Sequence, residues 1–91
     1  MRQHSDVMRW LSESHKGLAG IPVVELAGEG RVLIENHKGV VEYGTEKICV
    51  KVHYGILCVC GMNMELAKMS SEQLVIAGKI NSIIIQRKGN K

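Results

Sequence analysis

Residues 34–43 read IENHKGVVEY and decide how the surrounding chain is interpreted. The pattern predicts the end of one strand, a polar turn closed by glycine, and the start of the next strand. Asn36 can cap this turn through its side chain, and Gly39 can supply the positive φ that a bulged hairpin needs. We therefore expect a β-hairpin here, within a small and mostly β domain.

The β pattern extends to both sides of this turn, from Ile21 to residue 86. Strands are expected at 22–27, 31–35, 40–43, 46–53, 56–60, 62–67, 73–77 and 81–86. Glycine or polar breakers, including Gly61 and Gly78, separate them at intervals of about 8–12 residues. Such connections are too short for crossover helices, so the strands should pair antiparallel. The predicted fold class is mainly β: a small antiparallel sandwich, roll or barrel of about seven or eight short strands.

A short N-terminal helix is expected before this domain. Residues 5–16 are amphipathic, because Val7, Met8 and Leu11 share one helical face. A helix of this length is unstable alone, so it should dock on the β domain; a weak contact with a membrane surface is the alternative. The expected organisation is a helix and joint over 1–20, a β domain over 21–86 and a basic tail over 87–91.

The composition indicates one ordinary soluble domain. Among 91 residues, 45% are hydrophobic and 23% are charged, and the net charge is +3. The longest apolar run, residues 55–62, is far shorter than the roughly 18 residues that span a bilayer, so no transmembrane segment is expected. The N-terminus lacks the apolar centre of a secretion signal, so we expect a cytoplasmic protein whose cysteines stay reduced.

The strand alternation also predicts a second apolar face. Ile48 and Val50 fall on one face, and the even-numbered residues from 56 to 66 should keep a single parity through the glycine at 61. The opposite parity is also apolar, and the residues expected to form an interface face are Leu57, Val59, Val75 and Ile84. A cover from the same chain is favoured, either the N-terminal helix or a second layer of the sheet, and a homo-oligomer or a partner protein is the alternative.

Four sulfur-bearing side chains share one predicted parity: Cys58, Cys60, Met62 and Met64. Soft ligands of this kind suit Cu(I), and His53 could join them. Alternate strand residues are about 6.5–7 Å apart, however, and Cys and Met also fill hydrophobic cores well. Core packing is therefore expected, with no metal site and no cofactor.

His37 is the strongest candidate for chemistry, because histidine can act as an acid or a base near neutral pH. Glu35, Asn36 and Glu42 are near it in the sequence, but no nucleophile can be assigned to it. An exposed structural turn is the favoured interpretation. The alternative is a small-ligand-binding or catalytic β-barrel centred on the His37 turn.

Nucleic acid is not an expected partner. Tyr43 and Tyr54 are the only aromatic residues after Trp10, and each lies next to a glycine turn. The strands therefore offer no aromatic platform on which bases could stack, and only the mild positive charge would favour binding.

Several segments, taken in order, resemble the YabP/YqfC family of sporulation proteins, and most closely its YqfC branch. They are IPVVELAG at 21–28, NHKG at 36–39, EY at 42–43, EKICVK at 46–51, GILCVCG at 55–61 and AGKI at 77–80. The motif positions that the resemblance marks as a contact turn are Asn36, His37, Lys38, Gly39, Glu42 and Tyr43.

The resemblance implies a non-enzymatic protein made in the mother cell during spore formation. Members of the family are linked to late steps such as building the cortex and coat of the spore envelope. They tend to accompany sporulation membrane proteins, and the family offers no established catalytic residues. We therefore expect an assembly or adaptor factor in the mother-cell cytoplasm, peripheral to the membrane around the forespore, with a membrane-associated partner.

Overall fold

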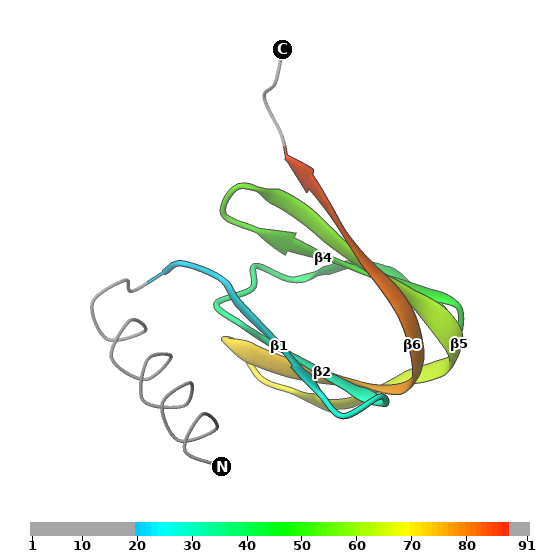
Figure 1. Ribbon diagram of the computed structural model, residues 1–91. Coiled ribbons are helices and arrows are strands. Elements are labelled where there is room, and N and C mark those ends of the chain that lie inside the picture. Colours follow the sequence, from blue (N-terminus) through cyan, green and yellow to red (C-terminus); the bar gives the residue numbers. More distant parts are fainter. Residues whose placement is uncertain (1–19, 88–91) are drawn as a thin grey trace, which may run out of the picture.

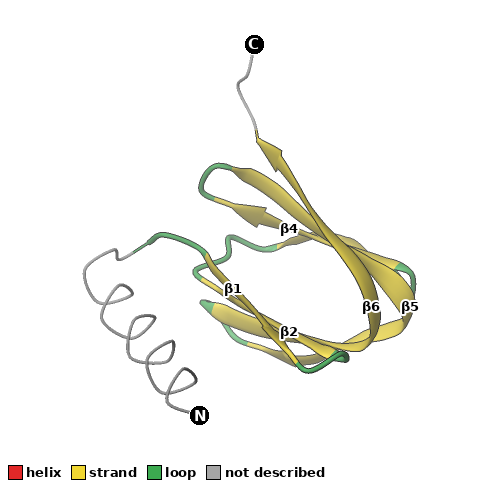
Figure 2. Cartoon of the chain, in the orientation of Figure 1, coloured by secondary structure: helices red, strands yellow, loops and turns green. Residues whose placement is uncertain are grey.

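The structure is a computed structural model that describes residues 20–87, and this part of the chain consists of six strands and their connections (Figure 2). The strands are β1 (Val23–Ala27), β2 (Arg31–Glu35), β3 (Val40–Tyr43), β4 (Lys47–Val52), β5 (Gly55–Met69) and β6 (Gln73–Arg87). They form one antiparallel sheet in the order β1-β2-β6-β5-β4-β3. The mainly β, antiparallel class is confirmed. The helix expected over 5–16 lies outside the described residues.

The predicted count of seven or eight strands is wrong, because two glycines bend strands that they were expected to end. β5 and β6 each have 15 residues, which would extend about 50 Å if straight, whereas the molecule is at most 36 Å long. A Cβ on Gly61 would lie 1.9 Å from the Lys79 carbonyl oxygen, and Gly78 has a φ of +146°. Only glycine allows the two strands to approach this closely, so the long hairpin curves at these positions.

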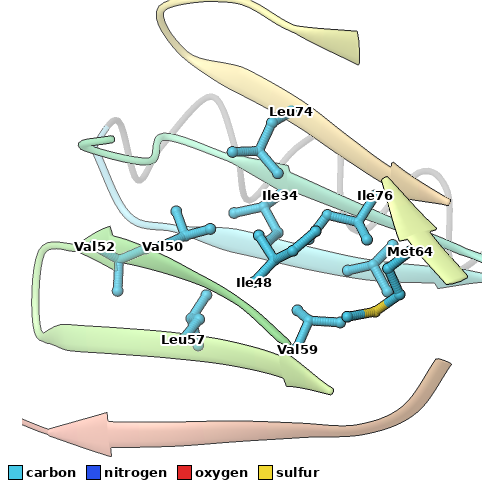
Figure 3. Packing of buried hydrophobic residues seen from close by; sticks show 10 residues of the cluster. Ile34, Ile48, Val50, Val52, Leu57, Val59, Met64, Leu74 and Ile76 are labelled. Carbon is cyan, nitrogen blue, oxygen red and sulfur yellow. The ribbon is translucent and has the colours of Figure 1, made fainter. Parts of the chain in front are cut away.

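The curvature folds the single sheet onto itself (Figure 1). One half contains β1, β2 and the adjoining ends of β5 and β6, and the other contains β3, β4 and the remaining ends. The hydrophobic core fills the space between the halves (Figure 3). Its buried members are Val32, Ile34, Ile48, Val50, Val52, Leu57, Val59, Met64, Leu74 and Ile76. The sheet is open, with β1 and β3 at its two edges.

The hairpin predicted over residues 34–43 is wrong, although the polar turn and its positive φ angle at Gly39 are correct. β2 and β3 follow each other in the chain but lie at opposite ends of the sheet, so residues 36–39 cross from one half to the other. Asn36 and Gly39 have φ values of +65° and +117°, which is the left-handed turn geometry that the sequence suggested. β2 is already paired with β1 and β6, so β3 cannot pair with it.

The single parity expected along β5 is also wrong. Leu57 and Val59 point into the core, and Met64 joins them there although its number is even. The register shifts between Met62 and Glu65, where Asn63 takes a φ of +52°, and this irregularity reverses the alternation. Leu57 and Val59 are therefore core residues rather than members of an exposed interface face.

Candidate functional site

The candidate site is the crossover of residues 36–39, named here the closing loop. Its backbone is joined by two hydrogen bonds to Lys51, near the end of β4. The Lys38 amide donates to the Lys51 carbonyl over 2.7 Å, and the Lys51 amide donates to the Gly39 carbonyl over 2.8 Å. The loop thus continues the hydrogen bonding of β3 and attaches the β2 half of the sheet to the β4 half.

Asn36 holds two other segments of the chain. Its backbone amide donates to the Glu72 carbonyl over 2.6 Å, which secures the turn between β5 and β6. Its side-chain Nδ2 donates to the Ile21 carbonyl over 2.7 Å, which secures the segment before β1. Asparagine is well suited to this position, because it tolerates positive φ and its amide still offers donors.

His37 is buried, with 7% of its surface exposed, so the expected exposed position of this residue is wrong. Its Nδ1 accepts a hydrogen bond from the Gly39 amide over 3.0 Å, and its Nε2 lies 2.9 Å from the Ser70 carbonyl oxygen. A carbonyl oxygen only accepts, so Nε2 bears the proton and Nδ1 bears none. The neutral ring therefore links the closing loop to the turn between β5 and β6.

This bonding leaves the His37 ring nitrogens committed to backbone atoms. The nearby Ser70 hydroxyl bonds within its own turn, since its Oγ accepts from the Gln73 amide over 3.1 Å. His37 contacts the Ser70 carbonyl and not that hydroxyl. The hydrogen bonds of His37 hold parts of the fold together, and they differ from those of a catalytic serine–histidine pair, in which the histidine contacts the serine hydroxyl.

The remaining motif positions, Glu42 and Tyr43, lie on edge strand β3, away from His37. Glu42 pairs with Lys47 at 3.9 Å and accepts a hydrogen bond from the Cys49 thiol over 3.8 Å. Tyr43 is 58% exposed. The motif thus divides into a structural part, Asn36 to Gly39, in which His37 is the buried residue, and an exposed part at the end of β3.

Two cysteines face each other on the side of the sheet opposite the core. Cys49 of β4 and Cys58 of β5 are directly paired in the register, and both are free and buried. Burial, followed by a hydrogen bond with the Cys58 thiol, raises the pKa of Cys49 to about 12. The sequence contained a signal for this pair, because a two-residue turn at His53 and Tyr54 sets this register.

The raised pKa of Cys49 predicts a loss of stability in alkali. The unfolded thiol ionises near pH 9.0 and the folded one near 12, so only the folded chain keeps the proton between these values. The free energy of unfolding should therefore fall as pH rises through this window, by at most about 1.4 kcal/mol per pH unit. Urea unfolding of the wild type and Cys49→Val under reducing conditions would measure it. A stability difference between the two that does not change with pH would contradict the prediction.

The sulfur side chains expected to share one parity are divided between two faces. Met64 lies in the core, whereas Cys58 lies opposite Cys49 on the other face. Across residues 20–87, no group of three or more His, Cys, Asp or Glu side chains is arranged to hold a metal ion. His53 is exposed in the turn that follows β4.

The predicted interface face is reduced to two of its four residues. Val75 is half-buried between the core residues Leu74 and Ile76, and Ile84, which pairs with Cys58, is 46% exposed.

Among the described residues, no helix has the length and apolar character needed to cross a membrane.

A comparison with protein families matches residues 22–91 to the model of the YabP family. The match covers all six strands and the closing loop. No match was found among curated proteins or among solved structures.

Proposed function

Because the chain belongs to the YabP family, we propose that it acts in spore formation as a non-enzymatic adaptor. Family membership is consistent with a sporulation protein. The observation that supports an adaptor over an enzyme is the state of His37, whose two ring nitrogens bind backbone atoms of the fold itself. A histidine bonded in this way stabilises the fold, and its ring nitrogens are already occupied and do not offer a proton donor or acceptor to a substrate.

The proposed setting is the mother cell, at the membrane around the forespore. In this role the chain assists assembly of the spore envelope by binding a membrane-associated sporulation partner, as expected of the YqfC branch. The resemblance of the segments quoted above supports this finer assignment.

The contact surface we propose is edge strand β3, which carries the exposed half of the motif. Val41 and Tyr43 are 54% and 58% exposed. Edge strands offer backbone donors and acceptors to an added strand, while exposed side chains give specificity. The closing loop fixes the start of β3 against β4, so this edge is presented in one defined position.

A pair of matched variants tests this surface. Val41 on β3 and Leu26 on β1 have equal exposure, 54%, and each lies on an edge strand. Val41→Asp should abolish capture of a sporulation-specific membrane protein from membranes of sporulating cells, whereas Leu26→Asp should retain it. Mass spectrometry identifies the captured protein, and membranes from non-sporulating cells serve as a control.

Three outcomes would contradict the proposal. They are equal capture by both variants, loss of capture only with Leu26→Asp, and failure of the wild type to capture any sporulation-specific membrane protein. Light scattering of the purified chain separates binding of a partner from self-association through the same edge.

A further inference from the structure

The outer face of the sheet contains a pair of thiols that the adaptor function does not use. Cys49 and Cys58 occupy paired positions on β4 and β5, and they are 3% and 4% exposed. Neither is part of the core cluster. We propose that this pair is a reversible redox site, which forms a disulfide by exchange with a low-molecular-weight disulfide.

The backbone hydrogen bonds show that the two cysteines form a non-hydrogen-bonded pair, the kind in which facing Cα atoms of antiparallel strands are closest. Both backbone groups of Lys51 bond to the closing loop, so they point away from β5. Backbone groups two residues apart on a strand point the same way, so the backbone groups of Cys49 are not hydrogen-bonded to those of Cys58. Residues paired in this way have Cα atoms about 4.5 Å apart, inside the range of about 4.4–6.8 Å that disulfides span.

The side chains around the pair hold the two sulfurs next to each other. The Cys49 thiol donates a hydrogen bond to the Glu42 carboxylate, and the two thiols are within hydrogen-bonding reach of each other. Glu42 lies on edge strand β3, which has four residues and is partly exposed along its length. Opening of this short edge gives a small disulfide access to the sulfurs.

The exchange is balanced in two steps. The Cys58 thiolate attacks one sulfur of the small disulfide, which forms a mixed disulfide and releases one small thiolate. Cys49 then loses its proton, attacks the Cys58 sulfur as a thiolate, and releases the second small thiolate. Two electrons pass from the protein sulfurs to the small disulfide, and the two thiol protons end on the released thiols.

The third cysteine provides a matched control. Cys60 is on the same strand as Cys58, two residues away, and it pairs with Lys47 instead of a cysteine. Trypsin separates the residues cleanly, because it cuts after Lys47, Lys51 and Lys68. Cys49 is then in peptide 48–51, while Cys58 and Cys60 share peptide 52–68.

The test treats the reduced full-length chain with oxidised glutathione, alkylates the remaining thiols, and digests with trypsin. We expect a species that joins peptides 48–51 and 52–68 and disappears with a reductant. Fragmentation should place the link at Cys58. The link should persist in Cys60→Ser and be lost in Cys58→Ser, with circular dichroism confirming that both variants fold.

Other results would overturn the proposal. One is a wild type that gains only glutathione adducts on peptide 52–68; another is a link that fragmentation places at Cys60. In Glu42→Gln ring closure should be faster, because the Glu42 carboxylate raises the pKa of the Cys49 thiol and so opposes formation of the attacking thiolate. An unchanged rate of closure would overturn the role of Glu42.

Discussion

Gly61→Ala should strongly destabilise the folded protein. The added methyl group would lie 1.9 Å from the Lys79 carbonyl oxygen and 3.2 Å from the Ile80 Cα, and both atoms belong to the backbone of β6. No rotamer change can relieve such a clash, so β5 and β6 would have to separate at the bend. Overpacking typically costs about 1–3 kcal/mol, and this case should reach or exceed about 3 because backbone must move. The total stability of a small domain is only about 5–15 kcal/mol.

Gly44→Ala is the matched control for this experiment. The nearest atom to its added Cβ would be the Lys47 carbonyl oxygen at 3.5 Å, an ordinary van der Waals contact. Urea unfolding followed by circular dichroism compares the two variants with the wild type. Gly44→Ala should unfold close to the wild type, and a Gly61→Ala protein within about 0.5 kcal/mol of wild type would contradict the bend described above.

His37→Ala should produce the second large loss of stability. It removes the acceptor of the Gly39 amide and the donor to the Ser70 carbonyl in a site that is 7% exposed. An unsatisfied buried polar group costs about 1–3 kcal/mol, so the two together should cost about 2–6 kcal/mol. His37→Gln should cost less, because its amide still offers a donor and an acceptor.

His53→Ala is the control for His37, because this histidine is exposed in the turn after β4. Its free energy of unfolding should stay within about 0.5 kcal/mol of the wild type. Nitrogen NMR of the folded chain should show His37 with an unprotonated Nδ1. If His37→Ala lost function with its stability and partner binding intact, the structural role would be wrong and a ligand or catalytic role for the turn would gain support.

The strand class could be predicted from the sequence because side-chain alternation is local. The number of strands could not, since a glycine within a β pattern has two meanings. Gly61 and Gly78 look like strand ends, but each permits close approach of two backbones across a bend. Asn63, which shifts the alternation in β5, gives no warning in the sequence beyond its tolerance of positive φ.

The turn residues of the closing loop were predicted correctly, and their partners were not. Positive φ at Gly39 follows from local chemistry. The burial of His37 depends on Ser70, which is 33 residues away in the chain and is brought close only by the folded sheet. A polar turn is normally expected at the surface, and no local pattern indicates that this one links the two halves of a sheet.

The order of the strands also has a kinetic consequence. β4, β5 and β6 are joined by short turns and pair with their neighbours in sequence, whereas β2 pairs with β6 across about forty intervening residues. We expect the three-strand meander to form in the folding transition state and the β1–β2 hairpin to dock after it. Substitutions of core residues on β4 should therefore slow folding, while equivalent changes on β2 should mainly speed unfolding.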